Sequence, residues 1–188
     1  MFMLWAIPAG IAIGFLAGGH MEGLSRLRIR WPWLAVGGLL VQVALFTPSG
    51  ELLAGAAVPA LYVGSTLAVF AAVLRNVALP GMPLVALGSV SNLLAIVANG
   101  GAMPADPSAL EAAGFLGPGE HTNSVVLDEP ALRPLTDIFA IPAGMPLANV
   151  FSVGDVLIAL GLAWLIAATM CRGPVEPAPP AERASAAR

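Results

Sequence analysis

Long stretches without charged residues alternate with short polar turns along most of the chain. A helix needs about 20 consecutive apolar residues to cross the hydrocarbon core of a bilayer. Five stretches approach this length: residues 2–19, 31–47, 57–74, 82–99 and 151–171. The first four lack Asp, Glu, Lys and Arg, and the last contains Asp155 alone. The pattern therefore predicts an all-α integral membrane protein, built as a bundle of five transmembrane helices.

Composition agrees with a membrane protein and narrows the chemistry. Of the 188 residues, 58% are hydrophobic and 10% are charged, against roughly a quarter charged in soluble domains. A net charge of -3 without a basic run argues against nucleic acid as a partner. Cys171 is the single cysteine, and only His20 and His121 accompany it. We therefore expect no disulfide, no metal site and no cofactor.

The arginines predict an orientation. Three lie between the first two stretches (Arg26, Arg28, Arg30), Arg75 follows the third, and Arg172, Arg183 and Arg188 follow the last. With five crossings these seven share one side, and only Arg133 lies on the other. Because arginine is enriched in cytoplasmic loops, we expect the N-terminus outside and the C-terminus inside. The Arg-rich, Lys-free composition is typical of a GC-rich bacterium, which indicates the bacterial cytoplasmic (inner) membrane.

The connection before the last stretch, residues 100–150, is then a long outer loop. It carries six of the eleven acidic residues. Its apolar pieces "SALEAAGFLG" and "PLTDIFAIPAGMPLA" indicate short interfacial helices lying on the membrane surface. Residues 1–171 thus form one membrane domain. The tail, residues 172–188, has the composition of a disordered segment and is expected in the cytoplasm.

Small residues recur at helical spacing on two of the predicted helices. Gly10, Gly14 and Gly18 allow close approach of another helix, and we favour packing within the chain over a homodimer. In the fourth helix a small and polar stripe is expected to face the bundle; it comprises Gly88, Ser91, Asn92, Ala95 and Asn99.

Asp155 is the only charged residue of the last hydrophobic stretch. Ser152 and Asp155 have the spacing of a capping box, which predicts that the helix begins at Val153. Asp155 would then lie in the first turn, near the outer interface, where the helix dipole favours a negative charge. Its presence is explained in this way without catalysis.

A functional interpretation remains open beside the structural one. Asn99 ends the fourth helix on the outer side, and Asp137 lies in the outer loop. Asn99, Asp137 and Asp155 could therefore converge at one outer site. Two carboxylates that share a site have separated pKa values, as aspartic peptidases require.

Two resemblances bear on these residues. The segments "NGGAMP", "DIFAIP" and "VFSVGDVLIALG" resemble a family of small bacterial multi-pass membrane proteins classed as a domain of unknown function, which implies no established activity. "TDIF" followed by "VFSVGDVLIALG" is also similar to the end of lipoprotein signal peptidases. That second resemblance implies Asp137 and Asp155 as a catalytic pair, with Asn99 orienting the substrate.

The chain departs from the signal peptidase pattern at several points. Ser152 stands where that family has Asn, and Gly154 where it has Ala. No Asn-Leu-x-Asp-Arg motif precedes Asp137, and the order of the segments differs. Our leading hypothesis is therefore an outer cap that is structural or partner-binding. Its binding residues would be Asn99, Gly100, Gly101 and Ser152.

The partners expected for such a cap are the lipid bilayer and another membrane protein or a lipoprotein precursor. The alternative is an outer-face aspartyl peptidase that uses Asp137 and Asp155. A small transporter is a third interpretation, but no buried charge pair marks a path through the middle of the membrane.

Overall fold

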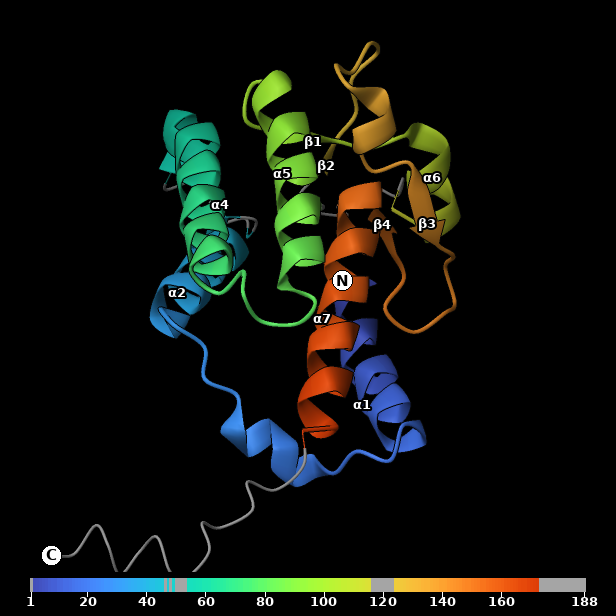
Figure 1. Ribbon diagram of the computed structural model, residues 1–188. Helices are drawn as coiled ribbons and strands as arrows, with labels where there is room; N and C mark the ends of the chain where they lie inside the picture. The colour runs from blue at the N-terminus through green and yellow to red at the C-terminus, as the bar shows by residue number, and fades with distance from the viewer. Residues whose placement is uncertain (1, 46, 48, 50–53, 116–123, 173–188) are drawn as a thin grey trace, which may run out of the picture.

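The computed structural model describes residues 2–45, 47, 49, 54–115 and 124–172, and they are mostly helical (Figure 1). The predicted disordered tail from residue 173 and His121 lie outside these ranges. The helices are η1 (Phe2–Trp5), α1 (Ala6–Leu16), η2 (Met21–Arg26), α2 (Pro32–Leu45), η3 (Gly55–Ala57), α4 (Val58–Arg75), α5 (Met82–Ala98), α6 (Pro107–Ala113), η4 (Arg133–Leu135) and α7 (Val153–Met170). The strands are β1 (Met103–Pro104), β2 (Ser124–Val125), β3 (Phe139–Ile141) and β4 (Asn149–Phe151).

Helix α7 lies at the centre of the helical part (Figure 1). Helices α1 and α5 both pack against it, α4 packs against α5, and α2 packs against α4. The described residues between α5 and α7 form a separate layer at the end of the molecule where α5 ends and α7 begins. We call this layer, residues 99–115 and 124–151, the cap.

Glycines permit the close packing of α7 on two sides. A Cβ atom on Gly10 of α1 would lie 2.8 Å from the Ala163 carbonyl oxygen, and one on Gly14 would lie 2.5 Å from Met170 Sδ. At Gly10 the nearest atom belongs to the α7 backbone, so a larger residue would push the helices apart, whereas at Gly14 the Met170 side chain would have to move. Gly10 and Gly14 thus face α7 of the same chain, and the preference over a homodimer stays a prediction. Gly18 differs, since it lies in the following turn with φ +80° and nothing within 4 Å of the Cβ position.

The prediction of five transmembrane helices is wrong. Among the described residues, two helices are long and apolar enough to cross a membrane: Gly55–Arg75, with 21 residues, and Val153–Met170, with 18. The apolar helices Phe2–Leu16, Pro32–Leu45 and Met82–Ala98 are shorter. A charge-free stretch is not a helix of equal length, because turns shorten it from both ends. Helix α2, for example, has 14 residues and covers only about 21 Å.

The orientation inferred from five crossings loses its basis with that count. With fewer crossings, the assignment of the N-terminus to the outside and the C-terminus to the inside no longer follows from the chain order. Which arginine-bearing segments lie side by side follows from the fold and not from the number of crossings.

The cap is only partly helical, which corrects the prediction of interfacial helices. The first apolar piece does form the short helix α6, started by Asp106 and Pro107. The second forms η4 and a β-hairpin, in which β3 and β4 pair antiparallel with Ala140 opposite Val150. Pro142 and Pro146 prevent a helix in this segment. A second two-stranded sheet, β1 with β2, is parallel.

A small apolar core holds the cap together. It joins α6 to the hairpin and comprises Ala105, Ala109, Leu110, Ala113 and Val150, each at most 5% exposed. Strand β4, which contributes Val150 to this core, directly precedes α7 in the chain. It ends at Phe151, and Ser152 is the N-cap residue of the helix. The cap therefore fixes the position of the first turn of α7.

Candidate functional site

The first turn of α7 carries the predicted capping box. The backbone N–H of Asp155 donates to Ser152 Oγ at 3.1 Å, and the backbone N–H of Ser152 donates to Asp155 Oδ2 at 3.1 Å. The helix begins at Val153, so both the capping box and the start of the helix are confirmed. The carboxylate lies where the partial positive charge of the helix N-terminus stabilises it.

Asn92 of α5 connects this turn to the neighbouring helix. Its amide Nδ2 donates to Asp155 Oδ1 at 2.8 Å, and its Oδ1 accepts from Ser152 Oγ at 2.9 Å. Together the four hydrogen bonds form a closed set among Asn92, Ser152 and Asp155, which we call the clasp. Ser152 is fully buried, and its hydroxyl both donates and accepts within the clasp.

Two glycines allow the clasp to close. A Cβ atom on Gly154 would collide with Asn92 Oδ1, and one on Gly88 would collide with the Gly154 carbonyl oxygen. Helices α5 and α7 therefore meet backbone to backbone directly beside the polar groups. This close approach explains how a short amide such as Asn92 reaches the neighbouring helix.

Asn99, Gly100 and Gly101 form the exit of α5 and hold the cap in a different way. The Asn99 side chain donates to the Ala131 carbonyl oxygen at 2.9 Å and accepts from the Ala131 N–H at 2.8 Å. Gly101 has φ +89°, and a Cβ atom there would lie 2.7 Å from Pro59 Cβ. Asn99 thus anchors a loop of the cap to the end of α5, and Gly101 lies against the start of α4, whereas Gly100 has nothing within 4 Å of its Cβ position.

Asp137 is buried in the cap, with 4% of its surface exposed. Its backbone N–H donates to the Pro104 carbonyl oxygen, and its own carbonyl oxygen accepts from the Asp106 N–H, each at 3.0 Å. Asp137 thus extends the pairing of β1, and Thr136 beside it is 1% exposed. The Asp155 carboxylate, in contrast, is held by Asn92 and Ser152.

Asp106 links α6 to Arg133. It accepts from the Ser108 hydroxyl and backbone N–H at the start of α6, and its Oδ2 lies 2.8 Å from Arg133 Nη2. The Ser108 hydroxyl and then Arg133 lower the pKa of Asp106 from 3.8 to about 2. The charged carboxylate stabilises the cap fully above pH 3.8, and this contribution is lost as the pH falls toward 2.

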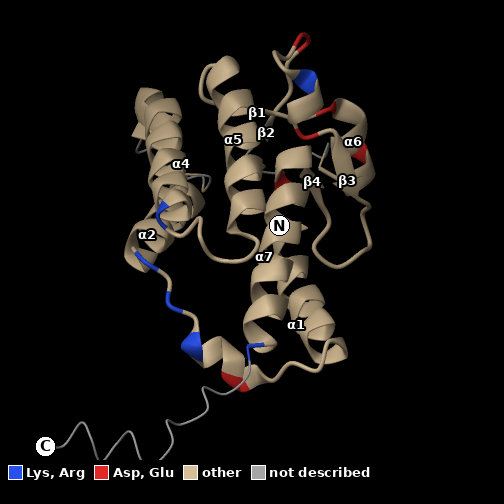
Figure 2. Cartoon of the chain, viewed as in Figure 1, with Lys and Arg blue, Asp and Glu red and all other residues tan. Residues whose placement is uncertain are grey.

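Charged residues are concentrated at the two ends of the molecule (Figure 2). The acidic residues of the cap and Arg133 lie at one end. Toward the other end, η2 and the link to α2 carry arginines, and Asn76 at the end of α4 bonds the Arg30 backbone at 2.8 and 2.7 Å. The His20 N–H donates to the Met170 carbonyl oxygen at 3.0 Å, which brings the end of α7 to the same place.

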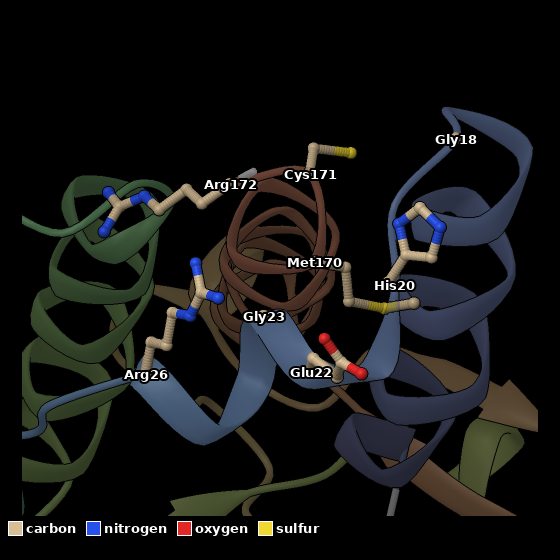
Figure 3. Close-up of a pocket in the computed structure, with 8 residues that line it drawn as sticks. All are labelled: Gly18, His20, Glu22, Gly23, Arg26, Met170, Cys171 and Arg172. Atoms are coloured by element: carbon tan, nitrogen blue, oxygen red, sulfur yellow. The ribbon is translucent and has the colours of Figure 1, made fainter. Parts of the chain in front are cut away.

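A pocket of about 320 Å³ opens at this arginine-bearing end (Figure 3). Gly23 of η2 lies directly beneath the last turn of α7, because a Cβ atom there would collide with the Thr169 carbonyl oxygen. Arg26 and His20 lie on opposite sides of the opening, whereas the Arg172 side chain points away from His20. No group of three or more His, Cys, Asp or Glu residues that could hold a metal ion occurs in the described part of the chain.

One comparison with known proteins identifies a family. Residues 26–167, from the end of η2 through most of α7, match a family of unknown function (DUF5317). The chain belongs to this family. No curated protein and no solved structure matches the chain. The resemblance to a domain of unknown function is thereby confirmed at the level of the family. The motifs quoted for it and the resemblance to lipoprotein signal peptidases remain predictions.

The match to the family covers the whole cap, all of α5 and most of α7. Asn92 is the residue of the clasp that was not among the predicted site residues. The signal for it was present, because Gly88 and Asn92 are four residues apart on one face of α5. What the sequence lacked was the identity of the helix that this face meets.

Proposed function

We propose that this chain is an integral protein of the bacterial cytoplasmic membrane, whose cap binds a partner at the membrane surface without catalysis. The proposal for the membrane starts from α4 and α7. Only 22% and 39% of their apolar windows are buried, unlike the core helices of a soluble protein. Exposed side chains on them include Leu61, Leu67, Leu74, Leu160 and Trp164, each at least 44% exposed. Such continuous apolar surface is typical of contact with lipid.

The shorter helices extend the same apolar surface beside these two. On α2, Leu40 is 63% and Val43 is 59% exposed, and on α5, Leu87 is 56% exposed. Most charged residues lie in the cap, in η2 and its link to α2, and at the ends of α4 and α7, while Asp155 lies between them in the clasp (Figure 2). Since arginine is enriched on the cytoplasmic side of membrane proteins, we assign the arginine-bearing end to the cytoplasm and the cap to the outer surface.

The closed set of hydrogen bonds in the clasp is the observation that carries the non-catalytic role. Each oxygen of the Asp155 carboxylate accepts a hydrogen bond from the protein, and the Ser152 hydroxyl is engaged on both sides. A general base or nucleophile must instead be directed at substrate or water. The arrangement supports a joint that sets the position of the cap on the helices.

The cap offers an apolar strip for a partner. Val126, Leu127 and Leu132 are 52%, 39% and 47% exposed, and they follow β2 and precede η4 in the chain. Exposed apolar side chains beside polar ones are typical of surfaces that bind proteins. The partner of the proposed cap is accordingly another membrane protein or a lipoprotein precursor, recognised by an extended apolar segment.

The membrane assignment is tested first, with the single cysteine as reporter. Cys171 lies exposed at the arginine-bearing end. In the matched variant Cys171→Ser with Glu111→Cys, the reporter is moved to α6 in the cap. We expect the protein to resist alkaline extraction. A membrane-impermeant maleimide added to spheroplasts should label only the second protein, and permeabilisation should expose Cys171. Release into the alkaline supernatant, or labelling of both proteins before permeabilisation, would refute the proposal.

The non-catalytic role is tested with Asp137→Asn and Asp155→Asn in native membranes. Folded abundance and the accumulation of uncleaved membrane-protein precursors are scored together. We expect no precursor in either variant and less folded protein in Asp155→Asn. Normal folding of both variants with build-up of the same precursors would instead support the aspartyl peptidase.

A further inference from the structure

The loop between β3 and β4 is an apolar segment within an otherwise acidic cap. Residues 142–148, "PAGMPLA", contain no charged residue, and neither do the strands on either side of them. Met145 is 54% and Leu147 is 42% exposed, and Phe139 at the start of β3 is 42% exposed. About half of the Met145 surface is thus exposed, whereas Phe139 is partly covered by the ring of Phe151.

The loop extends toward the helices and away from the rest of the cap. In Figure 1 it extends from the ends of β3 and β4 away from α6, in the direction of α1, and turns back before the lower end of α7. A stack of three aromatic rings fixes the hairpin in this position. Phe139 lies 5.5 Å from Phe151, and Phe151 lies 4.2 Å from Phe2 of η1, between ring centroids.

Two residues of the loop have the left-handed backbone conformation. Leu147 has φ +61° and Gly144 has φ +88°. The left-handed conformation is unfavourable for leucine, so its retention at an exposed position indicates a constraint. In this conformation the chain reverses direction while the Leu147 side chain stays exposed.

Few backbone donors of the loop need water. Pro142 and Pro146 have no N–H group. The N–H groups of Ala143, Met145 and Ala148 donate to the carbonyl oxygens of Ala112, Pro142 and Met145, at 2.8, 3.2 and 3.2 Å. Three of the five N–H groups of the loop are thus bonded within the protein. Irregular backbone does not face lipid inside the hydrocarbon core, so the loop backbone would lie at the polar interface and only its side chains would reach the acyl chains.

We propose that residues 142–148 insert into the lipid of the leaflet on the cap side, with Met145 and Leu147 among the acyl chains. The inference rests on the proposed membrane location. Lipid is the occupant that the surroundings favour, because the hairpin that carries the loop packs on η1 through Phe151 and Phe2, and Met3, Leu4 and Trp5 of η1 are 38–43% exposed. The loop anchors the cap beside α7, in addition to the clasp.

The test places an environment-sensitive fluorophore on the loop. In the Cys171→Ser background, Met145→Cys and Leu147→Cys are each labelled with a nitrobenzoxadiazole group and reconstituted into phosphatidylglycerol–phosphatidylethanolamine vesicles. Glu111→Cys on α6 is the matched control. We expect blue-shifted emission from both loop positions, with strong quenching by lipids that carry a nitroxide on the acyl chain. The control should emit as in water and be little quenched.

Each other outcome overturns the inference in a recognisable way. Water-like emission from both loop positions would place the loop in solvent. Blue-shifted emission without quenching by the nitroxide lipids would indicate a protein surface, such as a second copy, in place of lipid. Alkaline extraction of the same vesicles separates the two proposals. A protein that stays in the membrane while its loop is unquenched contradicts the loop insertion alone, whereas a released protein contradicts the membrane location.

Discussion

Asp155 has a donor on each of its carboxylate oxygens, and this decides what its replacement should do. In Asp155→Asn one oxygen becomes an NH₂ group, which would face either the Asn92 amide or the Ser152 N–H. A buried donor facing a donor costs about 1–3 kcal/mol. We expect a loss of this size in the free energy of unfolding in detergent micelles. Glu111→Gln, the same change at an exposed site, should alter it by less than about 0.5 kcal/mol.

The double variant Asn92→Asp with Asp155→Asn separates a structural role from a catalytic one. The carboxylate now at position 92 would accept from the Ser152 hydroxyl and from the new amide at position 155. The oxygen of that amide would accept from the Ser152 N–H, so all four hydrogen bonds of the clasp are retained. Recovery of stability above that of Asp155→Asn is therefore expected. A double variant less stable than both single variants would show that the clasp does not work as described.

At the scale of residues, contacts between near neighbours in the chain could be predicted, and contacts between distant residues could not. The capping box of Ser152 and Asp155 was readable because its members are three residues apart and act within one helical turn. The third member, Asn92, lies 60 residues before Ser152. Its partner could not be derived from one sequence, because nothing local states which helix faces which. Whether Asp137 and Asp155 act together remains a prediction of the signal peptidase resemblance.

At the scale of elements, glycines differ in how close the neighbouring helix lies to their Cβ position, and the tightest contacts are those around α7. A Cβ atom on Gly161 would lie 2.6 Å from the Gly81 carbonyl oxygen and 2.9 Å from Val85 N. Gly161→Ala must push α5 and α7 apart, at a cost of about 1–3 kcal/mol. Gly64 in α4 has nothing within 4 Å of its Cβ position. Gly64→Ala should be neutral or stabilising by up to about 1 kcal/mol.

Thermal unfolding of both variants in the same detergent makes this comparison. We expect a lower midpoint for Gly161→Ala and an unchanged or higher one for Gly64→Ala. Equal destabilisation by the two substitutions would mean that glycine content, and not the contact between α5 and α7, sets the stability of the helices.

The helices could be predicted in position, and α4 and α5 also in length. Every predicted hydrophobic stretch contains an apolar helix, since the absence of charge over such distances leaves few alternatives. The ends were missed mainly in the first two stretches, where α1 covers only Ala6–Leu16 and α2 only Pro32–Leu45. Helix α5, in contrast, lies within one residue of the predicted 82–99, since it starts after Gly81 with φ +77° and is followed by Asn99 and two glycines with positive φ. In the cap, two prolines and the pairing of β3 with β4 outweighed the apolar pattern that suggested a helix.

At the scale of the whole molecule, the exposed apolar surface is the feature that a bilayer would explain. Leu160 lies in the middle of α7 and is 56% exposed, and Leu132 in the cap is 47% exposed. In water, an arginine would be tolerated at either position, with an effect within about 0.5 kcal/mol. In a bilayer, an arginine at the centre of a helix costs about 2.5–3.5 kcal/mol on insertion scales.

The pair Leu160→Arg and Leu132→Arg therefore tests the proposed environment without reference to activity. We expect Leu160→Arg to reduce the membrane-integrated fraction several-fold after alkaline extraction, and Leu132→Arg to leave it near the wild-type level. The measurement is quantitative immunoblotting of pellet and supernatant. Because both residues are exposed leucines in the folded chain, a difference between them reports the medium around each. Integration of Leu160→Arg at the wild-type level would place this face of α7 in water or in a polar interface, and the cap would then need another explanation for its position beside an apolar helix bundle.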